Sequence, residues 1–345
     1  MAGLSQNEIT IIGGGIAGLA LGISLRRRDV PVTLLEASSY PRHRVCGEFL
    51  SGVSKKTLES LGLSSLLADA ERLQTTGWWD ERGSFLEATL PEPALGISRF
   101  RFDQRMAEEF ERLGGVLRER TRFRIGDDIA EGTVLATGRP LARESDWLGL
   151  KAHFLELPLE ADLEMHLGED GYLGMSRVED GRVNACGLFR KRDLRSKSTR
   201  LLGAYVRTCG LPALADRLDS AANDPDSCVG ISSFSFGRQK REQSSTICLG
   251  DRGSIIPPFT GNGMSMALQS AELALPLLLT YARGETSWET SHALFERDSQ
   301  TRFRKRLGVS RWLHPAMMSP RNRTILRGVS RAKLLPFHLL YRALR

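Results

Sequence analysis

A stretch near the N-terminus, residues 8–38, limits the possible folds more than any other part of the sequence. It reads EITIIGGGIAGLALGISLRRRDVPVTLLEAS. A short β-branched run is followed by a glycine-rich turn, by apolar residues at helical spacing and by a second apolar run at residues 32–35. This order predicts a strand, a tight turn, a helix and a second strand, which together form the βαβ unit of an α/β protein.

The three glycines of the turn have the GxGxxG spacing that is typical of dinucleotide-binding sites. Gly13 permits the tight turn, and Gly15 lets a pyrophosphate approach the backbone. Gly18 lets the helix pack closely on the strand. Because the spacing occurs with its strand, helix and second strand, we expect a nucleotide-binding domain.

The helix and the second strand supply two further candidate contacts. The helix begins at Ile16 and Ala17, where free N–H groups and the positive end of the helix dipole favour phosphate. Glu36 ends the second strand and can accept hydrogen bonds from a ribose. This motif alone allows either NAD or FAD as the ligand.

A second glycine-rich segment, residues 245–278, reads as a strand, a loop and a helix that begins near Met264. It resembles the GD…P…G.G…A segment of FAD-dependent enzymes of the para-hydroxybenzoate hydroxylase superfamily. The resemblance implies that Asp251 binds the ribityl chain and that the helix N-terminus faces the flavin, where its N–H groups would stabilise negative charge. It therefore favours FAD, with these residues in contact: Asp251, Pro257, Gly261, Asn262, Gly263 and Met264.

Residues 97–119 resemble the central helix of that superfamily, with Arg99, Asp103 and Arg105 at the positions of its charged pattern. The resemblance makes Arg105 a candidate contact for the FAD phosphates. The alternative is a solvated helix face with charge pairs four residues apart.

Residues 136–139 read Ala-Thr-Gly-Arg, where the superfamily usually has an Asp-Gly pair that is linked to both FAD and NADPH. The missing aspartate argues against a strong NADPH site. We therefore expect NAD(P)H only as a transient electron donor, and a separate reductase is the alternative.

The segment PRHRVCGEFLSG, residues 41–52, is similar to the loop beside the flavin in the geranylgeranyl-reductase-like branch of the superfamily. The resemblance implies that Arg44, or Arg42, neutralises cofactor charge and that Gly47 lets the backbone pass close to the ring. Cys46 is expected to be a small residue packed under the flavin, with a reactive thiol as the alternative. Glu48 is either an acid/base group near the ring or an ion-pair partner of Arg44. Cys46 and Glu48 are the only candidate catalytic residues.

The middle of the chain alternates as β-strands do, and Asp170-Gly171 and Asp180-Gly181 are hairpin signals. We expect an antiparallel sheet over the flavin, extended by residues 86–90 and 231–238. His153 and His166 are expected to be structural, hydrogen-bonded residues of this sheet. The tryptophan motifs of the reductases and of flavin halogenases are absent, which argues against a halogenase.

Charge is uneven along the chain. Residues 299–345 contain twelve Lys and Arg and no Asp or Glu, while the rest of the chain has more acidic than basic residues. This tail predicts either amphipathic helices on an anionic membrane surface or helices packed on the acidic body. Nucleic acid is not an expected partner, since no recognised nucleic-acid module accompanies the tail.

Composition is that of an ordinary globular protein, with 41% hydrophobic and 26% charged residues. The five scattered cysteines contain no CxxC pair, which predicts no disulfide framework, no metal site and a reducing cytoplasm. We expect no signal peptide and no spanning helix, because no window approaches ~18 uninterrupted apolar residues. Cytoplasmic localisation with peripheral membrane contact is the resulting expectation.

The fold class expected is α/β, with a Rossmann-like FAD-binding domain, an inserted antiparallel β-sheet substrate domain and a C-terminal helical tail. The expected boundaries are 1–75, 98–148 and 242–298 for the FAD domain, 76–97 and 149–241 for the sheet domain, and 299–345 for the tail. The resemblance implies a flavin monooxygenase that hydroxylates or epoxidises an apolar or aromatic small molecule through a flavin C4a-hydroperoxide. The alternatives are reduction of a prenyl or other C=C bond by flavin hydride, and a flavin-binding protein without turnover.

Overall fold

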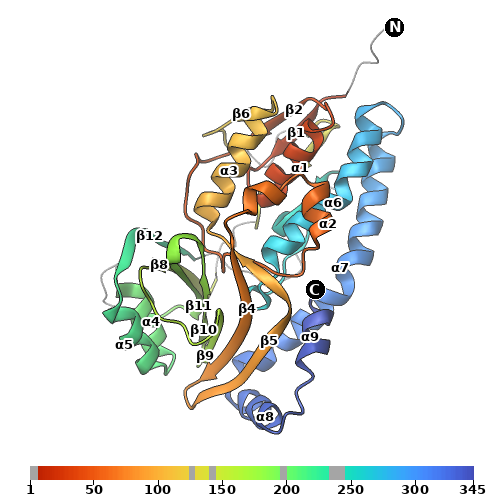
Figure 1. The fold of residues 1–345 in the computed structure, drawn as a ribbon. Coiled ribbons are helices and arrows are strands. Elements are labelled where there is room, and N and C mark those ends of the chain that lie inside the picture. Colours follow the sequence, from red (N-terminus) through yellow and green to blue (C-terminus); the bar gives the residue numbers. More distant parts are fainter. Residues whose placement is uncertain (1–6, 124–128, 140–144, 195–199, 233–244) are drawn as a thin grey trace.

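The computed structural model describes residues 7–123, 129–139, 145–194, 200–232 and 245–345. Its first layer is a five-stranded parallel sheet, sheet A, with the strand order β13-β7-β1-β2-β6 (Figure 1). The strands are β1 (Ile9–Ile12), β2 (Val32–Leu35), β6 (Val116–Arg118), β7 (Thr133–Leu135) and β13 (Ile247–Cys248). Parallel neighbours are joined by long crossover connections rather than by tight turns. Strand β13, near residue 247, can therefore belong to the same sheet as β1, at residues 9–12.

Three helices form the core around this sheet. Helix α1 (Ile16–Arg26) packs against both α3 (Arg99–Arg112) and α6 (Gly263–Ala282). Residues 16–25 of α1 are all buried, which explains why this helix is apolar on every side. The βαβ unit predicted from the glycine motif is confirmed.

The second layer is an eight-stranded sheet, sheet B, with the order β12-β8-β11-β10-β9-β4-β5-β3. Its strands are β3 (Phe49–Leu50), β4 (Glu71–Asp80), β5 (Gly83–Gly96), β8 (Trp147–Phe154), β9 (Leu163–Gly168), β10 (Gly171–Arg177), β11 (Val183–Arg190) and β12 (Asn223–Ile231). The expected antiparallel sheet is corrected in one respect: β4 and β9 pair in parallel. These two strands come from separate insertions into the chain, so no hairpin fixes their relative direction.

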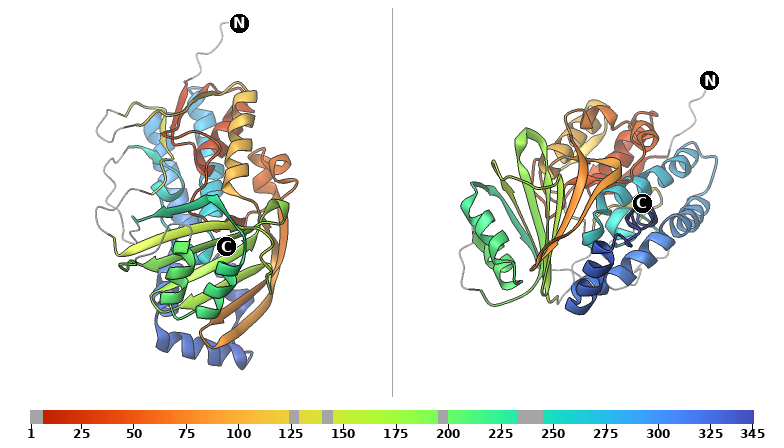
Figure 2. Two further views of the ribbon diagram at one scale, coloured as in Figure 1. Left: turned by 90° about the vertical axis from the view of Figure 1, so that its left-hand side faces the viewer. Right: turned by 60° about the horizontal axis from the view of Figure 1, so that its bottom comes forward.

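Helices cover sheet B on opposite sides, as the right-hand view of Figure 2 shows. Helices α4 (Leu201–Thr208) and α5 (Pro212–Ser220) pack on one side, against Leu150, Ala152 and Phe154 of β8. The tail helices lie on the other side. The remaining short elements are α2 (Lys55–Ser60) and the 3-10 helices η1 (Ser64–Leu67), η2 (Glu179–Gly181), η4 (Gly250–Arg252) and η5 (Pro258–Thr260).

The expected segment boundaries differ from the elements at several points. Strand β3 and the first two residues of β8 belong to sheet B but fall in the segments expected for the FAD domain. Strand β4 begins at Glu71, so sheet B starts before residue 76. The tail boundary at 298/299 falls inside the single helix α7 (Trp288–Met318). Of the strand expected at 231–238, Ile231 ends β12, and residues 233–244 lie outside the described residues.

The tail packs on the body of the protein through α7, α8 (Pro320–Arg331) and α9 (Phe337–Ala343). The guanidinium of Arg327 is buried against Asp80 of β4, and Ser330 donates to the carbonyl of Phe85. The Tyr341 hydroxyl lies 2.7 Å from the Ser51 hydroxyl. In the part of the chain that the structure describes, none of the helices combines the length and apolar character needed to cross a membrane.

Candidate functional site

The glycine turn has the geometry that a phosphate-binding loop requires. Gly13 has φ +108, and a Cβ there would collide with the backbone of Ala136. A Cβ on Gly18 would collide with the carbonyl of Gly13, so the helix can pack this closely only with glycine. In contrast, a Cβ on Gly15 would have no heavy atom within 4 Å. The open position is therefore the one at which the motif brings a pyrophosphate to the backbone.

Glu36 lies directly beside this loop. Its carboxylate accepts hydrogen bonds from the backbone N–H of Gly14 at 2.8 Å and of Ser38 at 2.9 Å. Nη2 of Arg42 lies 2.9 Å from Oε2 of Glu36. Burial raises the pKa of Glu36, but the hydrogen bond and charge of Arg42 outweigh it and hold the pKa below its usual value.

Arg42 also has hydrogen-bonding capacity to spare. Its Nε and Nη1 atoms are buried and have no hydrogen-bond partner in the described structure. Buried guanidinium groups are normally paired, so these atoms call for an anion or another acceptor. Together with the uncapped N-terminus of α1 and the open position at Gly15, they fit a bound dinucleotide.

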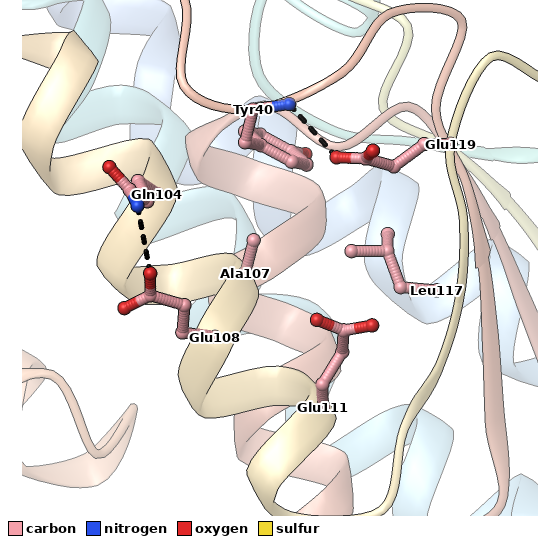
Figure 3. Close-up of a pocket in the computed structure, with 7 residues that line it drawn as sticks. All are labelled: Tyr40, Gln104, Ala107, Glu108, Glu111, Leu117 and Glu119. Carbon is pink, nitrogen blue, oxygen red and sulfur yellow. Dashed lines mark hydrogen bonds between the residues drawn. The ribbon is translucent and has the colours of Figure 1, made fainter.

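A surface hollow borders this loop, and Figure 3 shows the residues that line it. Tyr40 forms one wall, and its hydroxyl donates to the carbonyl of Gly14. The other walls carry the carboxylates of Glu108, Glu111 and Glu119. These carboxylates disfavour phosphate, so we do not assign the hollow to the dinucleotide.

The second glycine segment lies against the first. A Cβ on Gly250 would lie 3.4 Å from the Cβ of Ala17, which places η4 beside the start of α1. Gly261 adopts the left-handed conformation with φ +64, and α6 begins at Gly263 without a side-chain cap. The two motifs therefore place η4 beside the start of α1, and α6 packs against α1.

Asp251 and Arg139 form an ion pair in this region, with 3.3 Å between Nη2 and Oδ2. Arg139 belongs to the segment that lacks the expected aspartate, and it contacts the aspartate of the other motif. Residues 140–144 that follow lie outside the described residues.

The arginines of α3 differ in their roles from the expectation. Arg99 donates two hydrogen bonds to Asp103, at 2.7 and 2.6 Å, and the two residues are four apart, as in the alternative interpretation. Asp103 is buried, however, so this pair does not lie on a solvated face. Arg105 donates to both carboxylate oxygens of Asp69, at 2.5 and 2.9 Å. Its guanidinium is therefore paired next to η1 and not at the glycine loop, where the FAD phosphates were expected. Arg44 lies 3.9 Å from both Glu36 and Asp103. Among these arginines, Arg42 and Arg44 are therefore the ones at the glycine loop.

A buried polar cluster joins the loop 41–52 to sheet B. Oε2 of Glu48 lies 2.5 Å from Nε2 of His153, and Oε1 lies 3.2 Å from Nζ of Lys151. The same Oε1 accepts the backbone N–H of Arg99 at 3.0 Å. Nζ of Lys151 lies 3.0 Å from Nδ1 of His43, which stacks on Phe100. Glu48 and Lys151 are fully buried, so each charge depends on the other for compensation.

Sequence reasoning found Glu48 but missed its partners. It offered Arg44 as the ion-pair partner, whereas the structure pairs Glu48 with Lys151 and His153. Lys151 and His153 are two residues apart on β8, so they share the face of sheet B that is opposite to α4 and α5. The sequence did contain a signal for these partners: Lys151 and His153 alternate with apolar residues in β8, which places both on one face of the strand.

Cys46 is packed beside this cluster. The backbone N–H of Glu48 lies 3.4 Å from its Sγ, and burial raises the pKa of its thiol. The charge of Arg99 opposes that effect without cancelling it. The thiol therefore stays protonated at neutral pH, as the packed-residue interpretation of Cys46 requires.

Comparison with known proteins agrees with the Rossmann-like fold around sheet A. The model of the NAD(P)-binding Rossmann-like domain matches residues 11–65. Squalene epoxidase erg1 of Aspergillus fumigatus is 36% identical over 72 residues, which are 21% of this chain. The alignments cover only 15% to 25% of the curated relatives that the chain matches.

Two solved structures resemble nearly the whole chain. HpxO of Klebsiella pneumoniae, complexed with FAD and uric acid, is 15% identical with a TM-score of 0.74, and the match covers 98% of this chain and 95% of that chain. PqsL of Pseudomonas aeruginosa, described as a probable FAD-dependent monooxygenase, is 14% identical with a TM-score of 0.71 over 95% and 99%. The expected two-layer fold with a Rossmann-like sheet is thereby confirmed as the fold of these proteins.

Proposed function

We propose that this protein is an FAD-dependent oxidoreductase, and specifically a monooxygenase that acts on an apolar or aromatic small molecule. The observation that carries the proposal is the glycine loop, where an open backbone position, an uncapped helix and buried arginine donors converge. FAD would supply the redox chemistry, and the chain would bind and orient it. The residues we assign to FAD are Gly13, Gly15, Ile16, Ala17, Gly18, Glu36, Arg42, Arg44, Cys46, Gly47, Asp251, Pro257, Gly261, Asn262, Gly263 and Met264.

Names of similar proteins support this choice. HpxO is complexed with FAD and uric acid, PqsL is described as a monooxygenase, and erg1 is an epoxidase. Two of these three names, monooxygenase for PqsL and epoxidase for erg1, denote transfer of oxygen to a substrate.

An apolar substrate suits the side chains between sheet B and the tail. Tyr172, Leu188 and Met165 of sheet B cluster there with Phe259 and Met317. Phe259 lies in η5, immediately before the glycines of the second motif, so this apolar cluster adjoins the proposed cofactor site. NAD(P)H remains our proposal for a transient electron donor.

The first test is the visible absorption spectrum of the purified protein, followed by heat release and chromatography of the chromophore. We expect a yellow protein that releases FAD, and an Asp251→Ala variant that has lost it. A colourless protein that also fails to take up added FAD would overturn the proposal and leave NAD to test.

Oxygen dependence then separates the reaction classes. A monooxygenase couples oxygen consumption to conversion of the substrate. The Cys46-Gly47-Glu48 loop favours a second candidate, a C=C reductase, which would work without oxygen. A flavin-binding protein without turnover would do neither, and its flavin would be reduced slowly whatever substrate is offered.

A further inference from the structure

His153 has a buried atom that lacks a partner. Its Nε2 faces Oε2 of Glu48 at 2.5 Å, so Nε2 carries the proton and donates to the carboxylate. The opposite ring atom, Nδ1, is then a hydrogen-bond acceptor. It is buried, it has no partner among the described residues, and the residue is only 1% exposed. A buried acceptor without a donor costs free energy, so it calls for a ligand.

Asn184 presents a second such atom. Its Nδ2 donates to the carbonyl of Cys46 at 3.0 Å, which leaves Oδ1 as the free acceptor. Oδ1 is buried without a partner, and the residue is 0% exposed. Asn184 on β11 is the register partner of His153 on β8, so both side chains leave the same face of sheet B as close neighbours.

We propose that His153 and Asn184 form a binding site for a substrate hydroxyl group, in which His153 Nδ1 takes the proton of an acidic O–H such as that of a phenol or enol. This inference rests on the proposed function and names the class of its substrate. The substrate O–H bond breaks, its electron pair stays on oxygen, and a new N–H bond forms at Nδ1. Oδ1 of Asn184 accepts a hydrogen bond either from a donor group of the substrate next to its hydroxyl oxygen or from a bound water.

Glu48 is the positioning residue of this site. It fixes the tautomer of His153 and stabilises the imidazolium that forms, as a carboxylate does in a carboxylate–histidine pair. Burial raises the pKa of Glu48, but the His153 hydrogen bond and the charge of Lys151 hold it below its usual value. The carboxylate is therefore ionised at neutral pH.

Lys151 and His43 connect the pair to the surface. Nζ of Lys151 contacts both Glu48 and Nδ1 of His43, and His43 is partly exposed. The His43 and His153 rings meet edge to face with 5.2 Å between their centroids. Other titratable groups near this cluster are Asp224 of β12, Cys186 of β11, Cys46, Arg99 and Cys228.

The test uses 4-nitrophenol as the probe, because its ionisation changes its visible absorption, and 4-nitroanisole as the matched compound without the O–H. We expect the FAD-loaded protein to bind 4-nitrophenol about tenfold more tightly than 4-nitroanisole and to hold it as the phenolate below its solution pKa. His153→Gln should lose both effects and keep full flavin occupancy. Glu48→Gln should lower the phenolate fraction and shift its pH profile.

His166→Gln is the matched control, since His166 also pairs with a carboxylate on sheet B, Glu164 at 2.8 Å, but on another strand. It should bind both probes as the unmodified protein does. Equal binding of the two probes, or an unchanged phenolate signal in His153→Gln, would overturn the inference. Because flavin occupancy is measured separately, failure of the FAD proposal is distinguished from failure of this one.

A second, independent observation concerns the tail. The four large hydrophobic side chains that are most exposed in the described structure all lie there: Trp312, Ile325, Leu334 and Leu339 are 64% to 73% exposed. Three tail arginines are buried, Arg345 is partly buried, and the other eight basic residues are exposed. Within α8, Arg321 and Ile325 lie four residues apart on the exposed side, opposite the buried Arg323 and Arg327.

From this combination we infer that the outer side of the tail docks on an anionic lipid surface. Exposed cations complement anionic headgroups, and interspersed apolar side chains can insert among the acyl chains. The arginines that hold the tail on sheet B are separate from those that face outward, so the surface is available without unfolding the tail.

Sedimentation with phosphatidylglycerol vesicles and with phosphatidylcholine vesicles tests this inference. We expect binding to the anionic vesicles that weakens with salt, and a loss of about tenfold or more in a Trp312→Ser/Leu334→Ser variant. Leu155→Ser, an exposed leucine outside the tail, is the control and should bind normally. Equal binding to both vesicle types, or an unaffected tail variant, would contradict it.

Discussion

Gly15 and Gly18 are glycines for different physical reasons, and substitution separates them. A side chain at Gly15 meets open space in the free protein, so Gly15→Val should fold with nearly unchanged stability but lose FAD. Gly18→Ala should collide with Gly13 and lose about 1–3 kcal/mol of stability. Flavin absorbance and the thermal midpoint, measured on both variants, check this pair. Full flavin occupancy in Gly15→Val would show that the site is assigned wrongly.

His43 should make the stability of the protein depend on pH in a definite window. Burial, together with the charges of Lys151 and His153, lowers the pKa of His43 from 6.5 to about 4. Between these values the unfolded chain binds more protons than the folded one, so the contribution of His43 to stability falls as pH falls from about 6.5 to about 4. Glu48 and Asp224 oppose this shift only in part.

Urea unfolding of the unmodified protein and of His43→Gln, at intervals from pH 4.5 to 8, measures this effect. The difference in unfolding free energy between the two proteins should be constant above pH 7 and should shrink on acidification. A difference that does not vary with pH would mean that His43 titrates normally in the folded protein.

At the scale of elements, α8 is attached to sheet B by two buried arginines, Arg323 and Arg327. Arg327 pairs with Asp80 and donates to the carbonyls of Gly83 and Arg82. Arg327→Ala leaves the carboxylate of Asp80 buried without its partner, which should cost about 3 kcal/mol or more. Arg331→Ala, on the exposed end of the same helix, should stay within about 0.5 kcal/mol. Similar losses in the two variants would argue against the packed position of α8.

At the scale of the whole molecule, the two sheets should unfold together. The chain passes from sheet A to sheet B and back twice, and α7 contacts both β13 of sheet A and β9 of sheet B. We therefore expect a single calorimetric unfolding transition, whose measured enthalpy equals the van 't Hoff enthalpy. Many proteins of this size unfold in more than one transition. FAD in hundredfold excess over its Kd should raise the stability of the entire unit by about 2.7 kcal/mol. Two resolved transitions, with only one of them sensitive to FAD, would contradict this coupling.

The sequence by itself determined the local parts of this protein. The glycine turns, the βαβ unit, the start of α6 and the hairpin around Asp180-Gly181 follow from backbone conformations and side-chain periods that short segments specify. The resemblance built on those segments also predicted the two-layer architecture, which the similar solved structures confirm.

Only the tertiary structure decided which distant segments meet. It paired β4 with β9 in parallel, turned Arg105 to Asp69, packed the tail on sheet B and assembled Glu48 with Lys151, His153 and His43. Each of these contacts joins residues that are far apart in the chain, and no local pattern specifies the partner. Their partners are chosen by which buried charge or donor lies within reach once the core has formed, because an unpaired buried charge is too costly to keep.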